Sequence, residues 1–173
     1  MKERYIFPKG ILILIVFISW TACSEQIEQA IKIDNPFAGA WKFISLVGKS
    51  SDGEVFYPYG EKFYGQLMYD CKGNMSAFLM RPGRPKFTAG DIYKGTPDEI
   101  KAAFENFDAY CGTYTIDFEQ KTVTHFVEGS RFPNWEGSKQ TRNFKFSEKK
   151  LILSASLTAR GKQWSLEAVL VKK

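Results

Sequence analysis

The side chains of this chain that could do chemistry come from two neighbouring stretches. VTHFVEGSRFPNWEG (123–137) holds the only histidine, His125, and KQTRNFKF (139–146) holds Arg142. A histidine can transfer a proton near neutral pH, and an arginine can stabilise a developing enolate or carboxylate. The pair would suit a cofactor-free isomerase or cyclase acting on a small apolar substrate, with His125 as the candidate catalytic residue. A carrier could use the same residues, because Arg142 and Gln140 would hold the polar end of a bound molecule.

Other kinds of site lack their sequence motifs. A hydrolase would need Ser130 or Cys111 beside His125, but the chain has no G-x-S-x-G elbow. One histidine and two separated cysteines provide no pair of metal ligands at a diagnostic spacing. No Walker or dinucleotide glycine pattern occurs, and RPGRP (81–85) is a proline-stiffened basic turn. We therefore expect neither a metal ion nor a cofactor, and binding is favoured over catalysis.

The alternation of side chains along the two stretches predicts which residues point inward. Val123, His125 and Val127 share one face of their strand, so the histidine should lie inside. Gln140 and Arg142 fall on the aromatic face of the next strand. Burying a guanidinium without a partner costs several kcal/mol. Arg142 therefore needs carbonyl groups, a bound anion, or a carboxylate, for which Glu128 and Glu167 are the internal candidates of a filled barrel.

The elements that must position these residues are short extended runs separated by turn signals. Aromatic residues make up 16% of the chain, which favours β-structure. The expected runs cover residues 39–47, 54–59, 63–70, 74–80, 112–118, 121–128, 139–146, 149–157 and 163–171. Several are joined by tight turns, which favours an antiparallel up-and-down closure. The fold class predicted is therefore all-β, an antiparallel barrel with one short helix.

That helix is indicated by its capping residues. Thr96 stands at an N-cap position, Pro97 follows as the first helical residue, and Glu99 can complete a capping box. An apolar stripe with helical spacing follows, formed by Ile100, Ala103, Phe104 and Phe107. We expect the stripe to lie against the sheet or to plug one end of the barrel. A lid over a cavity is the functional alternative.

The first 36 residues have the composition of an export signal and a tether. Basic residues precede an apolar run, ILILIVFISW, that is too short to span a bilayer, and Thr21-Ala22-Cys23 resembles a bacterial lipobox. We predict a lipoprotein signal peptide over 1–22, lipidation at Cys23, a tether over 23–36 and the barrel domain over 37–173. The expected location is the bacterial cell envelope, with the protein lipid-anchored on its periplasmic or surface side. Trp20 departs from the lipobox, so plain secretion is the alternative.

The charge and the two remaining cysteines limit the partners. The chain has 24 basic and 19 acidic residues with no clustered basic face in its sequence, so we expect no nucleic-acid partner. Cys71 and Cys111 would remain in the mature protein. An oxidising compartment would permit a disulfide between them, and small buried thiols are the alternative.

Several blocks of the sequence resemble a known family. Gly39-Ala40-Trp41 is similar to the G-x-W signature of lipocalins, in which the tryptophan packs across one end of the barrel. A longer resemblance, to the bacterial and fungal lipocalin-like domain family, rests on the blocks LMYDCKGNMSAFLMRPGRPKF (67–87) and HFVEGSRFPNWEG (125–137). It covers about residues 38–172 and implies a calycin-type antiparallel barrel of eight to ten strands.

The resemblance implies little settled biochemistry, so the ligand is predicted from the residues. A mostly apolar interior with a few inward polar groups favours a small, largely apolar or amphiphilic molecule, which could be anionic, held inside the barrel. The predicted ligand-binding residues are His125, Gln140, Arg142, Asn134, Trp135, Met80 and Arg81. A packed structural protein of the envelope, without a ligand, is a further alternative.

Overall fold

The computed structural model describes residues 35–159 and 161–173, of which Phe37–Lys173 forms one compact unit. The predicted signal peptide, the lipidation at Cys23 and nearly all of the tether fall outside the described residues, so they stay predictions. No helix within the described ranges is long and apolar enough to cross a membrane.

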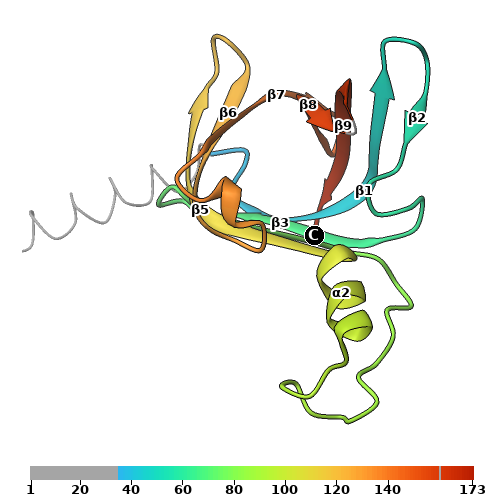
Figure 1. The fold of residues 1–173 in the computed structure, drawn as a ribbon. Helices are drawn as coiled ribbons and strands as arrows, with labels where there is room; N and C mark the ends of the chain where they lie inside the picture. The colour runs from blue at the N-terminus through green and yellow to red at the C-terminus, as the bar shows by residue number, and fades with distance from the viewer. Residues whose placement is uncertain (1–34, 160) are drawn as a thin grey trace, which may run out of the picture. The chain divides into compact units, whose positions relative to one another are not determined.

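The chain forms a single antiparallel sheet that closes on itself (Figure 1). Its strands are β1 (Gly39–Ser50), β2 (Val55–Phe56), β3 (Tyr64–Tyr69), β4 (Asn74–Met80), β5 (Phe107–Asp117), β6 (Thr122–Ser130), β7 (Lys139–Ser147), β8 (Lys150–Ala159) and β9 (Lys162–Lys172). They are hydrogen-bonded in the order β2-β1-β3-β4-β5-β6-β7-β8-β9, and β1 also pairs with β9. Because β2 only extends the edge of β1, the closed barrel has eight strands. The predicted antiparallel barrel is confirmed.

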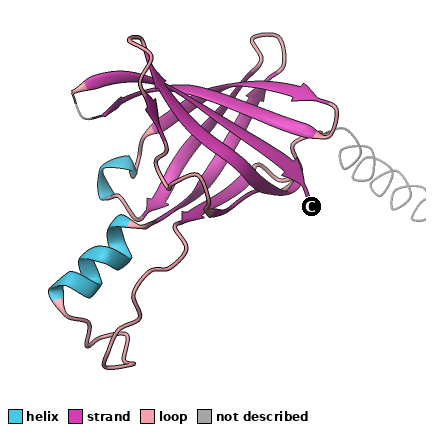
Figure 2. Ribbon diagram, turned by 90° about the vertical axis from the view of Figure 1, so that its right-hand side faces the viewer, coloured by secondary structure: helices cyan, strands magenta, loops and turns pink. Residues whose placement is uncertain are grey.

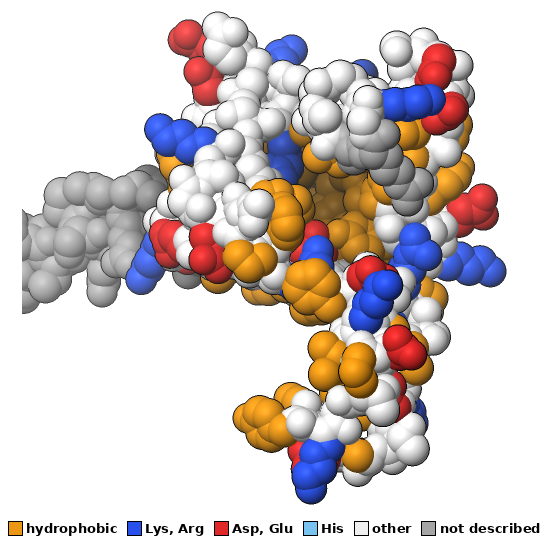
Figure 3. Space-filling view, in the orientation of Figure 1, with side chains coloured by type: hydrophobic (Ala, Val, Ile, Leu, Met, Phe, Trp, Pro, Cys, Tyr) orange, Lys and Arg blue, Asp and Glu red, His pale blue; other side chains and the backbone are white. Residues whose placement is uncertain are grey.

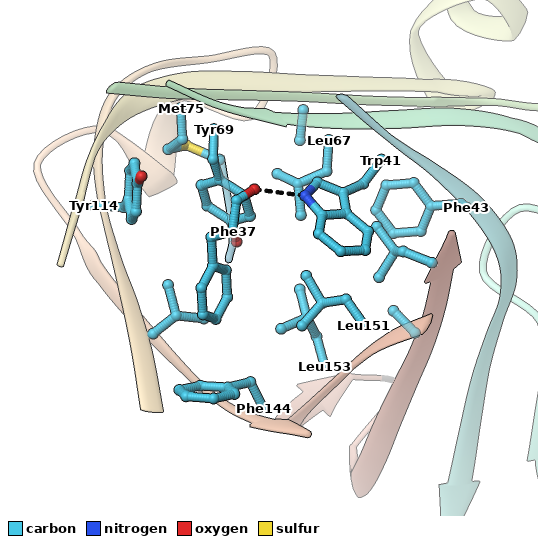
Figure 4. Close-up of a cluster of buried hydrophobic side chains, with 14 of the residues drawn as sticks. Phe37, Trp41, Phe43, Leu67, Tyr69, Met75, Tyr114, Phe144, Leu151 and Leu153 are labelled. Carbon is cyan, nitrogen blue, oxygen red and sulfur yellow. Dashed lines mark hydrogen bonds between the residues drawn. The ribbon is translucent and has the colours of Figure 1, made fainter. Parts of the chain in front are cut away.

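One end of the barrel interior is filled by aromatic side chains (Figure 4). Phe37 is fully buried, and its ring packs edge-on against Tyr69 and Phe144 at centroid distances of 5.4 and 4.9 Å. The carbonyl of Phe37 accepts a hydrogen bond of 2.6 Å from Trp41 Nε1. Buried edge-to-face pairs and a satisfied indole N–H stabilise such a cluster beyond its area. These residues form the floor of the barrel.

The helix begins where the sequence predicts and ends earlier. α2 (Pro97–Glu105) has the expected capping box, in which the Thr96 side chain accepts from the Glu99 amide while the Glu99 carboxylate accepts from the Thr96 amide. Phe107 is not helical but is the first residue of β5. An aromatic residue suits a strand, and the pairing of Phe107 with Met80 of β4 stabilises that conformation.

The position of α2 differs from both expectations. The helix extends away from the barrel and has no buried residue (Figure 2). Ile100 is 53% exposed and Phe104 is 47% exposed. The prediction of a helix that covers the core or plugs the barrel is wrong, and the described helix does not act as a lid in this arrangement.

The two predictions for the cysteines, a disulfide or buried thiols, are wrong as well. Cys71 and Cys111 are both exposed and unpaired.

Candidate functional site

The half of the barrel above the aromatic floor contains an open cavity of about 720 Å³. Figure 3 shows this side of the molecule, where a hollow with largely hydrophobic walls opens toward the viewer. The apolar side chains around the cavity come from six strands and include Phe43, Phe56, Leu67, Leu79, Leu153, Ala155, Leu157, Leu166 and Ala168. β8 and β9 contribute five of these apolar side chains, at every second position of each strand.

A group of polar side chains occupies one part of the wall. Arg142 Nη1 donates to the Gln140 carbonyl at 2.9 Å, and Nη2 donates to Gln140 Oε1 at 2.8 Å and to Tyr110 Oη at 3.2 Å. All three residues line the cavity, and we call them the polar corner. β5 contributes the phenol and β7 contributes the other two. The predicted inward positions of Gln140 and Arg142 are observed.

Arg142 has no acidic partner in the described part of the chain. The pairing with Glu128 or Glu167 that the sequence allowed is absent, because no ion pair within residues 35–159 and 161–173 includes this guanidinium. The half-buried cation is held by a carbonyl, an amide oxygen and a phenol oxygen instead. The polar corner therefore keeps a positive charge.

His125 lies behind the polar corner and not in the cavity wall. Its side chain is fully buried, with Nε2 2.7 Å from Tyr69 Oη and Nδ1 3.2 Å from Tyr110 Oη. Burial, together with the positive charge of Arg142, holds the pKa of His125 well below its usual 6.5. The imidazole is therefore neutral. Tyr110 lines the cavity and contacts the imidazole, whereas His125 itself does not line the cavity.

A second polar cluster lies on the same strand, two residues before Tyr110. Asp108 is 3% exposed, accepts from Tyr59 Oη at 2.8 Å and from Arg131 Nε at 3.2 Å, and lines the cavity together with Tyr59. Burial and the neighbouring carboxylate raise the pKa of Tyr59, so its phenol stays protonated. The Asp108 charge is balanced by Arg131, which also packs over the ring of Phe104 at 4.2 Å.

Asp108 and Tyr110 were not predicted, because the expected helix was followed as far as Phe107 and the next expected strand began only at residue 112. The signal that would have found them is the alternation of Asp108 and Tyr110 with Ala109 and Cys111, which has the period of a strand.

The other predicted ligand-binding residues lie in different places. Trp135, in the 3-10 helix η1 (Pro133–Trp135), lines the cavity, and its ring stands edge-on to Tyr110 at 5.9 Å. Asn134 in the same turn is exposed. Met80 Sδ accepts from Arg84, and the exposed Arg81 donates to the Pro58 carbonyl at 3.1 Å. Asn134, Met80 and Arg81 do not line the cavity, so a role for them in binding stays a prediction without support from the geometry.

The arrangement suits binding by shape and hydrogen bonds. No group of three histidine, cysteine or acidic side chains within the described ranges could hold a metal ion. The apolar walls provide a large contact area for an apolar ligand, and the polar corner provides hydrogen-bond donors that would fix the orientation of that ligand.

Two comparisons with known proteins agree with this arrangement. A family model described as a lipocalin-like domain matches residues 38–173. A 4'-hydroxy-3'-methoxypropiophenone carrier protein of Aspergillus oryzae is 36% identical over 74 residues, a match that covers 39% of this chain and 67% of that protein.

Proposed function

This chain belongs to the lipocalin-like domain family, and on that premise we propose that it binds a small, largely apolar molecule in the barrel cavity. The molecule's apolar body contacts the aliphatic and aromatic walls, and its polar end contacts the polar corner. The relative from Aspergillus oryzae supports this proposal, because its name describes a carrier of an aryl ketone. Eight-stranded barrels are wide enough inside to hold one small ligand.

The single observation that carries the proposal is the state of Arg142. A guanidinium has five N–H donors, and three are used inside the protein, so two have no partner among the described residues. A half-buried cation with free donors at the wall of an apolar cavity favours a ligand that supplies the missing acceptor. The cavity volume of about 720 Å³ lies within the usual range for small-molecule sites, roughly 300–1,000 Å³.

The two alternative functions, a packed structural protein and an isomerase or cyclase, require features that the described residues do not provide. A packed structural barrel would need side chains where the cavity is. An isomerase or cyclase with His125 as its base would need the imidazole at the cavity wall, and Tyr110 stands between them. Binding requires only the walls and the polar corner.

A titration with 4'-hydroxy-3'-methoxypropiophenone tests the binding function. The protein is purified without detergent, and the tryptophan emission is followed, since Trp135 lines the cavity. We expect a saturable change with one molecule bound per chain, confirmed by native mass spectrometry. Loss of the emission change in the variant Trp135→Phe would assign that change to Trp135. No binding of the ketone, together with no thermal shift across a panel of fatty acids and aryl ketones, would contradict the proposal.

We also propose that the barrel is exported and held at the cell envelope by a lipid on Cys23. The support is the composition of residues 1–22, the Thr21-Ala22-Cys23 motif and the polar stretch that follows. The variant Cys23→Ser should move the protein from the membrane to the soluble fraction of the envelope, while Cys71→Ser should not. Unchanged membrane association of Cys23→Ser would show that another element anchors the chain.

A further inference from the structure

Four side chains form a hydrogen-bonded row from the barrel floor to the cavity. Tyr69 Oη is 2.7 Å from His125 Nε2, Tyr110 Oη is 3.2 Å from His125 Nδ1, and Arg142 Nη2 is 3.2 Å from the same phenol oxygen. Tyr110 and Arg142 line the cavity, whereas Tyr69 and His125 do not. The direction of each hydrogen bond in this row can be worked out from the residues at its two ends.

The buried end of the row fixes the position of the proton on the imidazole. Tyr69 is 2% exposed, and its hydroxyl has no described hydrogen-bond partner except His125. A buried O–H that donates to nothing is unfavourable, so Tyr69 donates to Nε2. A neutral imidazole has one donor and one acceptor nitrogen. With Nε2 accepting, Nδ1 carries the hydrogen and donates to Tyr110.

The cavity end of the row is fixed by the guanidinium. Arginine has no acceptor atom, so Arg142 Nη2 donates to Tyr110 Oη. The phenol oxygen therefore accepts two hydrogen bonds, one from each neighbour, and its two lone pairs are occupied. Its own hydrogen cannot point at either donor. The remaining direction is the cavity that the phenol lines.

We infer that Tyr110 donates its hydroxyl hydrogen into the cavity, so that the bound molecule presents a carbonyl-type acceptor oxygen to Tyr110 and Arg142. This inference rests on the proposed binding function and specifies the chemical class of the ligand's polar end. A ketone or a carboxylate meets both donors, while an alkyl group in the same place leaves them unpaired. Sites that hydrogen-bond a ligand group strongly disfavour analogues that lack it.

The proton positions are tested by nitrogen NMR of the imidazole, without any ligand. His125 is the only histidine, so its two ring nitrogens are assigned without ambiguity. We expect a neutral ring that is protonated at Nδ1 at pH 7, and a change of the Nε2 shift in Tyr69→Phe. A ring protonated at Nε2, or at both nitrogens, would overturn the inference, because Tyr110 would then have another acceptor or another charge beside it.

The ligand class is tested with matched probes. Affinities are measured for 4'-hydroxy-3'-methoxypropiophenone, for 2-methoxy-4-propylphenol, which lacks the carbonyl, and for 3-(4-hydroxy-3-methoxyphenyl)propanoic acid. We expect the ketone to bind about tenfold or more tightly than the alkyl compound. The carboxylate arm shows whether the acceptor oxygen is neutral or charged. Equal affinities for the ketone, the acid and the alkyl compound would overturn the carbonyl preference.

Two tyrosine variants separate Tyr110 from a general effect of removing a phenol. In Tyr110→Phe the preference for the ketone over the alkyl compound should fall to about threefold or less. Tyr59→Phe removes a phenol from the same cavity whose hydrogen is already donated to Asp108, so the preference should persist. An equal loss of the preference for the ketone in both variants would contradict the inference.

The outcomes for the inference and for the binding function differ. If the cavity binds all three compounds but the ring is protonated at Nε2, binding stands and the donor role of Tyr110 fails. If the ring is protonated at Nδ1 and none of the three compounds binds, the proton positions stand, and the ligand class inferred here fails.

Discussion

At the scale of single residues, Arg142 is expected to favour ligand binding at the expense of stability. Its charge has no carboxylate partner in the described part of the chain, and it is half-buried in the barrel wall. We expect Arg142→Met to keep or raise the melting temperature, because an apolar side chain replaces a poorly compensated charge. The affinity for the propiophenone should fall about tenfold or more, since a charge-assisted hydrogen bond is lost.

Calorimetry and the fluorescence titration measure the two effects of this substitution. Lys145→Met, on the exposed face of the same strand, is the matched control and should change neither quantity. A large loss of stability in Arg142→Met with unchanged affinity would mean that the guanidinium is structural.

His125 makes a prediction about pH. Its folded-state pKa is lowered well below 6.5, whereas the unfolded chain titrates near that value. Between these two pKa values the unfolded state binds one more proton than the folded state, so the free energy of unfolding decreases as the pH falls below about 6.5. The slope can reach about 1.4 kcal/mol per pH unit from this one group.

Urea unfolding at pH 7, 6 and 5 measures this slope. His125→Gln should be less stable at pH 7, since its amide cannot serve both Tyr69 and Tyr110, but its stability should depend less on pH. Thr124→Val, on the outer face of the same strand, should keep the slope of the unmodified protein. An unchanged slope in His125→Gln would refute the assignment.

At the scale of elements, β5 and β6 meet at a glycine beside which there is no room for a Cβ atom. A Cβ on Gly112 would lie 2.0 Å from the Phe126 carbonyl oxygen and 2.9 Å from the Glu128 amide nitrogen. The register between the strands shifts at this point, between Cys111 and Gly112. Bulges of this kind re-aim the side chains of a strand. Tyr110, whose phenol contacts His125, stands two residues before this glycine on the same strand.

We expect Gly112→Ala to destabilise the fold by about 3 kcal/mol or more, because the backbone atoms that a Cβ meets cannot move aside as a side chain could. Gly129→Ala is the matched control across the strand pair. Its Cβ would lie 3.5 Å from Cys111 Sγ, an ordinary contact, so the change should stay within about 0.5 kcal/mol. Chemical denaturation of both variants measures these changes in the free energy of unfolding. Similar stabilities would mean that the bulge relaxes at low cost.

The elements also show which parts of the site a sequence can reveal. The alternation of side chains along a strand predicted that Val123, His125 and Arg142 point inward, because this pattern depends only on the local sequence. The end of the helix could not be predicted from the local sequence. Capping residues mark its start, while its end depends on the pairing of Phe107 with Met80 in β4.

The partners of the predicted residues depend on distant parts of the chain. His125 meets Tyr69 across 56 positions, and this contact requires the register of several strands. The sequence therefore predicted that the histidine is inside but not that two phenols flank it. Arg142 was predicted to need a partner, and the structure shows that carbonyl, amide and phenol oxygens take part instead of a carboxylate.

At the scale of the whole molecule, the barrel divides into a filled half and an open half. Phe37, Trp41 and Phe144 close the floor, while small side chains such as Ala155 and Ala168 stand in the wall of the cavity. Small residues in an unfilled interior leave room that a larger side chain could occupy without strain. The shape of the cavity can therefore be changed without changing the fold.

Ala155→Phe tests whether this open half is the binding site. Ala155 lies on β8 opposite Leu166 and lines the cavity, so a phenyl ring there should project into empty space. We expect an unchanged or higher melting temperature, because apolar surface is buried without displacing neighbours, and a loss of propiophenone affinity of about tenfold or more. Ser165→Phe, exposed on β9, adds the same ring outside and should leave affinity unchanged. If Ala155→Phe binds the ketone as tightly as the unmodified protein, the ligand occupies another surface and the polar corner does not orient it.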